Sequence, residues 1–216
     1  MILFNHNTKN QSHILVNRIS EDAAFYLKGL VLTEFDRNEL AKYLIEKRKL
    51  QWYASRYALK KLLNRNDIIY LNKDAYGKPF IENSSMHISL SHTQHMVVAM
   101  SNNTFEIGVD VEQIKEKVKR IAHKFTTEIE TALINPKTEI ESLITIWSAK
   151  ESIYKMYSQK QLDFKDHILL EPFTYTISGQ FKAILQKDDL YKELIVHYTT
   201  IEDHILTYVE DISPNI

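Results

Sequence analysis

The chain has 216 residues, of which 44% are hydrophobic and 25% charged, and its formal net charge is −1 with histidine neutral. A chain this apolar buries enough surface to offset the entropy lost on folding, which excludes an intrinsically disordered protein. Because 27 basic residues nearly balance 28 acidic ones, no global field attracts nucleic acid or anionic membranes, and an anionic ligand would need a local basic cluster.

The sequence contains no cysteine, which excludes a disulfide framework, a thiolate zinc site and a cysteine nucleophile. Its first residues lack a basic flank followed by a long apolar run, so we expect no signal peptide. No stretch approaches the roughly 18 apolar residues of a membrane span. We therefore expect a cytoplasmic protein with no membrane partner.

The first half is predicted to contain one long helical region among short strands. Apolar residues recur at helical spacing over about 37–64, with a break near 45–49. Alternating or apolar runs predict strands at 13–19, 68–71, 86–91 and 96–101. Residues 74–79 form a predicted turn, and Asn102-Asn103 is a predicted hairpin turn into a strand at 104–111.

The second half is predicted to place its helices before its strands. We expect helices at about 118–125, 127–134 and 138–158, then strands at 173–177, 181–185, 194–199 and 205–209. Helices grouped apart from mostly adjacent strands favour an α+β fold over a doubly wound parallel sheet. A boundary near Asn102–Asn103 divides the chain into an N-terminal subdomain, 1–103, and a C-terminal subdomain, 104–216.

The segment Ile107-Gly108-Val109-Asp110-Val111-Glu112 contains two carboxylates two positions apart. On a strand, Asp110 and Glu112 project to the same face, while the apolar residues between them point the other way, into a core. Two carboxylates held close together repel each other unless a cation lies between them. The alternative is the solvent-exposed face of an edge strand.

The segment Trp147-Ser148-Ala149-Lys150-Glu151-Ser152-Ile153-Tyr154-Lys155 is the second candidate. On a helix, Trp147, Glu151 and Lys155 share one face. Trp147 favours burial, so Glu151 is predicted to lie in a partly enclosed place. The alternative is an ordinary surface ion pair between Glu151 and Lys155, since such pairs are common on helices.

The remaining candidates are residues that could bind an anion. Lys78 lies in the predicted Gly77-Lys78-Pro79 turn, and Ser91 and His92 end a predicted strand. Arg48 and Arg56 belong to the basic predicted helix. Taken singly, each of these residues is as well explained by ordinary surface or core roles.

Taken together, the four segments GKPF, SLSH, IGVDVE and WSAKESIYK resemble the 4'-phosphopantetheinyl transferases of the large, single-chain type that activates surfactin synthetase. The resemblance extends from about residue 47 to residue 155. Thr93 departs from the family, in which many members have serine after the histidine. The family also often has a glutamate a few residues after the position of Phe125, where Ile129 stands here between Glu128 and Glu130.

The resemblance implies two similar α+β subdomains related by pseudo-twofold symmetry, with the active site in the cleft between them. It also implies transfer of the phosphopantetheine arm of coenzyme A to a serine of an apo carrier protein, releasing adenosine 3',5'-bisphosphate. The carrier would be an acyl carrier protein or a carrier domain of a fatty acid, polyketide or nonribosomal peptide synthase. Because one chain supplies both subdomains, we expect a monomer.

The resemblance further implies the roles of individual residues. Asp110, Glu112 and Glu151 would hold Mg²⁺, which agrees with a donor set made of oxygens alone. Glu151 would be the base, directly or through a metal-bound water, with Lys150 as its competitor. Lys155 would stabilise charge on the pyrophosphate, and Trp147 would be structural.

The nucleotide of coenzyme A and its 3'-phosphate would be held by Lys78, Ser91, His92 and Arg56, with Arg48 as a weaker candidate. Two other functions are compatible with these residues. One is a metal-dependent phosphodiesterase or nuclease, although the charge balance argues against nucleic acid. The other is a non-catalytic module that binds coenzyme A or a carrier protein.

A basic segment follows the two carboxylates of 107–112. Over residues 113–125 the lysines and Arg120 far outnumber the single acid, Glu116. Because carrier proteins are typically acidic around their serine, Lys117, Lys119 and Arg120 are predicted to attract the carrier. The alternative is a solvated helix face.

Overall fold

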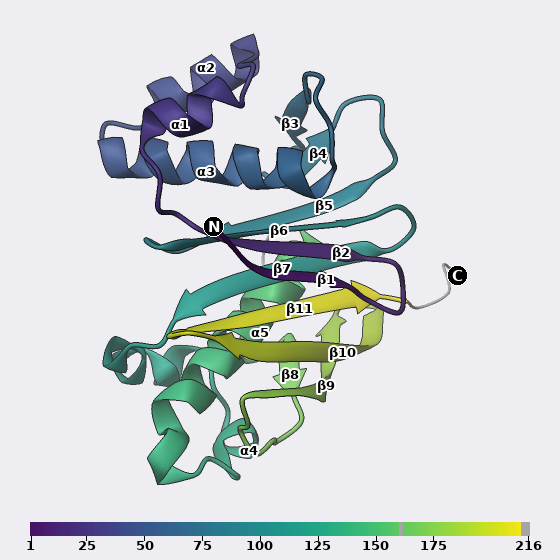
Figure 1. Ribbon diagram of the computed structural model, residues 1–216. Helices are drawn as coiled ribbons and strands as arrows, with labels where there is room; N and C mark the ends of the chain where they lie inside the picture. Colours follow the sequence, from purple (N-terminus) through teal and green to yellow (C-terminus); the bar gives the residue numbers. More distant parts are fainter. Residues whose placement is uncertain (160–161, 213–216) are drawn as a thin grey trace. The chain divides into compact units, whose positions relative to one another are not determined.

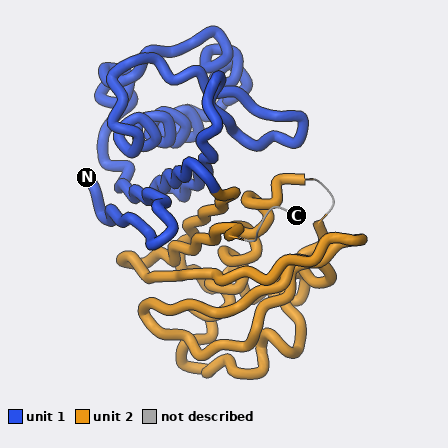
Figure 2. The backbone as a smooth tube through the Cα atoms, turned by 90° about the vertical axis from the view of Figure 1, so that its right-hand side faces the viewer, with its two compact units in different colours: residues 1–104 blue, residues 105–216 orange. Residues whose placement is uncertain are grey.

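The computed structural model describes residues 1–159 and 162–212. The chain divides into two compact units, Met1–Thr104 and Phe105–Ile216 (Figure 2). Both contain helices and antiparallel sheets, in agreement with the predicted α+β class. In the described part of the chain, no helix is both long and apolar enough to cross a membrane.

Unit 1 contains a four-stranded antiparallel sheet in the order β1-β2-β6-β5, with α3 lying along one face (Figure 1). Its sheet strands are β1 (Ile2–Asn7), β2 (His13–Arg18), β5 (His87–His92) and β6 (Met96–Asn102). A separate ribbon pairs β3 (Leu71–Lys73) with β4 (Pro79–Ile81). The helices are α1 (Ala23–Lys28), α2 (Glu34–Ala41) and α3 (Glu46–Leu62).

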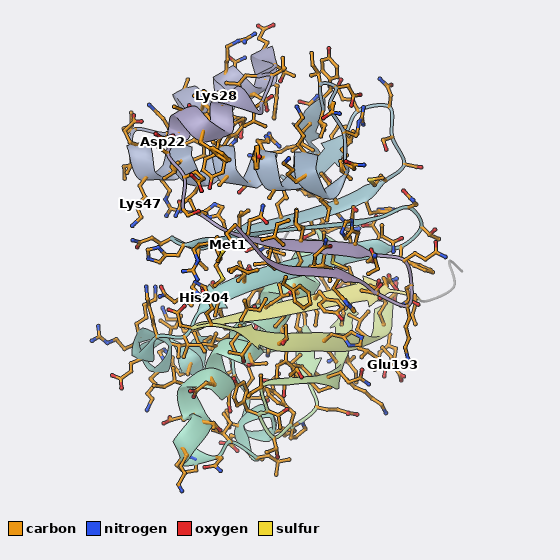
Figure 3. All side chains as sticks on the ribbon, in the orientation of Figure 1. Met1, Asp22, Lys28, Lys47, Glu193 and His204 are labelled. Atoms are coloured by element: carbon orange, nitrogen blue, oxygen red, sulfur yellow. The ribbon has the colours of Figure 1, made fainter. Side chains whose placement is uncertain are left out.

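The helices α1 and α2 of unit 1 begin at side chains that cap them, whereas α3 begins after Ile45 without a side-chain cap. The carboxylate of Asp22 accepts a hydrogen bond from Phe25 N at the start of α1, and Lys28 lies in its last turn (Figure 3). Thr33 and Asp36 form a reciprocal capping box at the start of α2. The region predicted as helical over 37–64 contains two helices, and the break lies at 42–45, earlier than the predicted 45–49, which mostly belongs to α3.

Unit 2 contains a five-stranded antiparallel sheet in the order β7-β11-β10-β9-β8, with α5 packed across β7 and β11 (Figure 1). Its strands are β7 (Glu106–Gln113), β8 (Ile168–Leu170), β9 (Ser178–Lys187), β10 (Leu190–Ile201) and β11 (His204–Asp211). The helices are α4 (Glu128–Thr131) and α5 (Glu139–Tyr157), with 3-10 turns η1 (Glu116–Arg120), η2 (Ala122–Lys124) and η3 (Pro136–Thr138).

The long helix α5 is buried on two sides, each with its own chemistry. Ile146, Ala149 and Ile153 belong to the apolar core of unit 2. Ser148 and Ser152, equally buried, face β7 and β11 with small hydroxyl side chains. A helix that packs on both sides is held in a defined rotation, which sets the direction of its remaining side chains.

Several predicted elements differ from the structure. β6 and β7 belong to different sheets, so the predicted hairpin at Asn102-Asn103 is wrong. Asn102 is instead buried and fixes the connection between β6 and β7 by hydrogen bonds. Its amide nitrogen donates to Asn10 O and Ser12 Oγ, and its side-chain oxygen accepts from Thr104 N. The predicted helices at 118–125 and 127–134 shorten to two 3-10 turns and one turn of α-helix.

The strand predicted at 173–177 is absent from the described structure, where 171–176 carry no regular element. Its aromatic residues pack as anchors instead: the ring of Phe173 stacks on Phe181 at 4.3 Å, and Tyr175 lies against Tyr198. The alternation that predicted a strand therefore reflects aromatic packing against β9 and β10. The elements β1, β4, β8 and α1 were not predicted, and of the strand predicted at 68–71 only Leu71 belongs to β3.

Candidate active site

Strand β7 presents Gly108, Asp110 and Glu112 on the face that packs against α5. Asp110 accepts a hydrogen bond from Ser148 of α5, and Gly108 lies against the helix backbone at Ser152. Asp110 is only 3% exposed, although β7 is an edge strand of its sheet. The alternative of a solvent-exposed acidic face is thus wrong for Asp110, whereas the predicted alternation of faces is correct.

Helix α5 supplies Trp147, Glu151 and Lys155 to the same place. Lys155 Nζ lies 2.6 Å from Asp110 Oδ1 and 3.3 Å from the backbone oxygen of Val109. Trp147 Nε1 donates to Glu112 Oε1 at 3.1 Å. Lys155 therefore pairs across to β7 rather than with Glu151 along the helix.

The carboxylates of Asp110, Glu112 and Glu151 act on one another electrostatically. Burial raises the pKa of Glu151 to about 7, and the charges of Asp110 and Glu112 add to this shift while Lys155 opposes it. Burial and then the charge of Asp110 also raise the pKa of Glu112. This is the signature of negative charge that one ammonium group does not fully offset.

The donor set of this cluster fits a hard divalent cation, because it consists of carboxylate oxygens in a half-buried place. Within residues 1–159 and 162–212, however, no three His, Asp or Glu side chains stand close enough together to hold a metal ion. One oxygen of Asp110 is bound to Lys155. The chemistry of the residues therefore fits Mg²⁺, and in their present geometry Lys155 pairs with Asp110 alone among the three carboxylates.

Lys150 does not join these carboxylates. Its side chain is fully buried, and Nζ lies 2.7 Å from Glu130 Oε1 and 2.7 Å from the backbone oxygen of Phe164. Burial lowers the pKa of Lys150, and Glu130 opposes the shift. This placement contradicts Lys150 as a competitor for the base, because its ammonium is enclosed among structural partners.

Glu130 is the buried acid of the segment that follows Phe125. It is 2% exposed, it caps α4 by accepting from Thr127 N, and it also accepts from Leu170 N of β8. Ile129 is 69% exposed and contributes nothing comparable. In this segment the residue with structural contacts is therefore Glu130 and not Ile129.

Three functional features of the cluster were not predicted from the sequence. The hydroxyl of Ser148 donates to Asp110 Oδ2 at 2.8 Å and contacts Thr207 Oγ1 at 2.9 Å. Trp147 holds Glu112 in addition to packing against Phe125. The four-residue spacing of the serines on α5 was a usable signal, but nothing local marks Thr207.

A sequence model of the 4'-phosphopantetheinyl transferase superfamily matches residues 106–209, the range that contains every member of this cluster. Residues 106–209 belong to the 4'-phosphopantetheinyl transferase superfamily. The predicted family resemblance is confirmed over this range, which begins and ends within β7 and β11.

The chain is also similar to the 4'-phosphopantetheinyl transferase gsp of Aneurinibacillus migulanus, with 34% identity over 104 residues. The match covers 46% of this chain and 43% of that transferase. The similarity thus spans less than half the length of this relative.

The other predicted site residues lie in unit 1, outside the range matched to the transferase superfamily. Lys78 follows a turn in which Asp74 accepts its backbone N–H, and Gly77 there has a φ of 95°, which favours glycine. Ser91 and His92 end β5, with His92 exposed. Arg48 is exposed in the first turn of α3.

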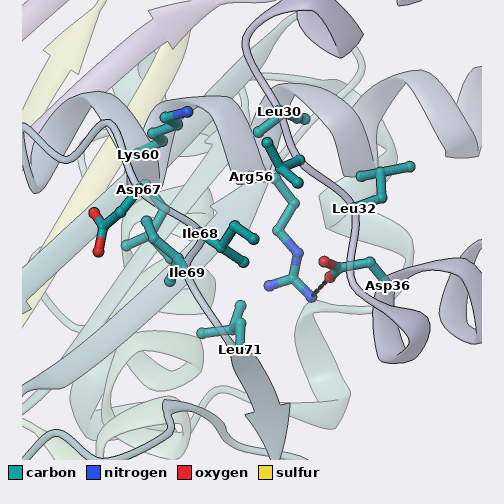
Figure 4. Close-up of a pocket in the computed structure, with 11 residues that line it drawn as sticks. Leu30, Leu32, Asp36, Arg56, Lys60, Asp67, Ile68, Ile69 and Leu71 are labelled. Atoms are coloured by element: carbon teal, nitrogen blue, oxygen red, sulfur yellow. Dashed lines mark ion pairs between the residues drawn. The ribbon is translucent and has the colours of Figure 1, made fainter.

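Arg56 differs from these residues, because it is buried in unit 1. Its guanidinium lies 3.1 Å from Asp36 Oδ1 and stacks over Trp52, at the wall of a cavity of about 30 Å³ (Figure 4). Its side chain is only 13% exposed. This placement favours a structural role for Arg56, which ties α3 to α2, over the predicted contact with the nucleotide.

Proposed function

We propose that the protein transfers the 4'-phosphopantetheine arm of coenzyme A to a serine of an apo carrier protein. The observation that carries this proposal is the cluster of Asp110, Glu112, Glu151 and Lys155 within the superfamily range 106–209. The serine oxygen forms a bond to the phosphorus that carries the pantetheine. The bond from that phosphorus to the bridging oxygen breaks, so adenosine 3',5'-bisphosphate leaves and the serine proton passes to a base.

Glu151 is the proposed base, because no hydrogen bond or ion pair engages its carboxylate in the described structure, whereas Glu112 accepts from Trp147 and Asp110 pairs with Lys155. Asp110, Glu112 and Glu151 are the proposed ligands of Mg²⁺. When bound, this ion supplies positive charge to the pyrophosphate oxygens as the bond to the leaving group lengthens. Lys155 adds a second positive charge at the same carboxylates, where negative charge develops on the leaving group.

Lys78, Ser91, His92 and Arg48 are the proposed contacts to the nucleotide and its 3'-phosphate. The exposure of His92 and Arg48 supports this part of the proposal, since both side chains are accessible to a ligand. The proposed partner is an acyl carrier protein or a carrier domain of a polyketide or peptide synthase. The proposal extends to a monomer that acts in the cytoplasm.

Incubation of the protein with coenzyme A, Mg²⁺ and an apo carrier protein tests the function directly. We expect the carrier to gain the mass of one phosphopantetheine group, and the gain to disappear in Glu151→Gln. A carrier of unchanged mass with coenzyme A bound tightly would instead indicate a non-catalytic binding module. Hydrolysis of a phosphodiester without transfer to the carrier would indicate the alternative phosphodiesterase.

A further inference from the structure

Behind Asp110, three hydroxyl groups form a continuous buried chain. Ser148 and Ser152 come from α5 and Thr207 comes from β11, and all three residues are 0% exposed. Thr207 Oγ1 lies 2.9 Å from Ser148 Oγ and 2.5 Å from Ser152 Oγ. Thr207 is also the residue directly opposite Asp110 in the antiparallel pairing of β11 with β7.

The carboxylate of Asp110 sets the direction of this chain. Ser148 has one hydroxyl proton and donates it to Asp110 Oδ2 at 2.8 Å. Thr207 has a single hydroxyl proton and two acceptors on Ser148: it donates to the backbone oxygen at 2.8 Å, and its Oγ1 also lies 2.9 Å from Ser148 Oγ. Ser152 donates in turn to Thr207, either at Oγ1 or at the backbone oxygen 3.1 Å away. Hydrogen bonds aligned in one direction strengthen one another.

Both oxygens of Asp110 are consequently held. Ser148 binds Oδ2 from the buried side, while Lys155 binds Oδ1 from the more open side, its own side chain being 26% exposed. A carboxylate held at both oxygens has its plane fixed, and a small rotation of that plane would misdirect the lone pairs available to a ligand.

Neighbouring hydroxyls on the same helix behave differently. Ser142 and Thr145 are as buried as Ser148, but each donates only to a backbone oxygen four residues earlier, at 2.8 Å. That is the usual arrangement of a buried serine or threonine in a helix. Ser148 of α5 and Thr207 of β11 instead contact each other, and Ser148 also donates to the carboxylate of Asp110.

We propose that Thr207, acting through Ser148, is a positioning residue that orients the carboxylate of Asp110 for the transfer reaction. The expected effect on the transfer rate rests on the proposed function. The expected orientation of Asp110 rests on the hydrogen bonds alone. Thr207 is too deeply buried to meet either substrate, so its effect must pass through Asp110. Loss of its hydroxyl removes both contacts of Thr207 with Ser148, at the backbone oxygen and at Oγ, and so frees Ser148 to rotate away from Oδ2.

The decisive comparison uses Thr207→Val, Thr207→Ser and Thr145→Val. Valine keeps the shape of threonine and removes only the hydroxyl, serine restores the hydroxyl, and Thr145→Val removes an equally buried hydroxyl that does not reach Asp110. We expect Thr207→Val to lower kcat about tenfold with KM for coenzyme A and carrier unchanged. Thr207→Ser should recover kcat to within about twofold of wild type, and Thr145→Val should match wild type.

Crystal structures of the same variants give a result that does not depend on activity. We expect the carboxylate of Asp110 to turn or to occupy two orientations in Thr207→Val, and to keep its place in Thr145→Val. If Thr207→Val does not fold, the pair Ser148→Ala and Ser148→Thr answers the same question one bond closer to Asp110.

An unmoved Asp110 in Thr207→Val, or an equal loss of kcat in Thr145→Val, would overturn the inference. A wild-type protein that transfers nothing would overturn the proposed function instead. In that case the orientation of Asp110 in the crystal structures still decides whether Thr207 positions it.

Discussion

Gly108 of β7 lies directly against the backbone of Ser152 in α5. A Cβ atom on Gly108 would stand 1.8 Å from the Ser152 carbonyl oxygen, which no side chain can accommodate without displacing the helix. Two residues further along β7, Asp110 reaches both Ser148 and Lys155 of the same helix. The absence of a side chain at Gly108 therefore sets the distance at which the two carboxylate-bearing elements meet.

Gly108→Ala should displace α5 from β7. Because the clash is with backbone, we expect the free energy of unfolding to fall by about 1–3 kcal/mol. We also expect the transfer rate per folded molecule to fall, because the displaced helix carries Glu151 and Lys155. Urea denaturation and kcat measure the two effects. Gly179→Ala is the matched control, since its Cβ would meet the hydroxyl and ring carbons of Tyr198 at 2.8–3.0 Å instead of the backbone of α5. A control that loses as much activity per folded molecule would contradict this account.

Glu151→Gln should separate catalysis from stability. Removal of a general base typically lowers the rate by about 10²- to 10⁴-fold. The fold should be no less stable, because burial and neighbouring carboxylates already disfavour the charged form of Glu151 and raise its pKa to about 7. Rates of carrier modification and urea midpoints provide the measurements, and near-normal turnover in the variant would show that another group is the base.

Lys150→Met should have the opposite profile. It leaves the carboxylate of Glu130 buried without its cation, which typically costs about 3–5 kcal/mol. Activity per folded molecule should change only a few-fold, since Lys150 does not reach Asp110 or Glu151. Denaturation and active-site titration would check both statements; a stable variant that has lost transfer entirely would instead make Lys150 a catalytic residue.

Lys78→Ala and Arg56→Ala should differ in kind. Loss of one charge-assisted hydrogen bond at Lys78 should raise KM for coenzyme A about tenfold with little change in stability. Arg56→Ala removes the buried partner of Asp36 and should cost about 3 kcal/mol of stability while KM stays near normal. Calorimetry with coenzyme A and with dephospho-coenzyme A distinguishes the two variants. Weaker binding of coenzyme A by folded Arg56→Ala would show that Arg56 is a ligand of the nucleotide.

Reversal of exposed charge in η1 should slow association with the carrier. Lys117 and Arg120 are exposed, and η1 follows β7 directly in the chain. The charge of Lys117 partly opposes the rise that burial causes in the pKa of Glu112. Lys117→Glu with Arg120→Glu should reduce kcat/KM for the carrier about tenfold at low salt and much less at high salt.

Affinity for coenzyme A should not change in the same double variant. Lys119→Gln serves as the control, because Lys119 already pairs with Glu139 at 2.6 Å and offers less free charge to a partner. Equal carrier kinetics for wild type and the double variant at low ionic strength would show that the carrier docks elsewhere.

Spacing along the chain was sufficient to place the main candidates on common faces. The period of two on a strand put Asp110 and Glu112 together, and the helical period put Trp147, Glu151 and Lys155 together. The same local patterns predicted the antiparallel α+β character and most strands of unit 2. These features depend on residues only a few positions apart, and their spacing can be read directly from the sequence.

Only the tertiary structure decided which of these faces meet, and how. The pairing of Lys155 with Asp110, the burial of Lys150 against Glu130, and the support of Asp110 by Thr207 join residues far apart in the chain. Arg56 looked like a phosphate ligand until its partner Asp36 was visible. Charge and hydroxyl groups have no periodic preference for one partner over another, so their roles follow from the packing of Gly108 against α5 and from the register of β11 beside β7.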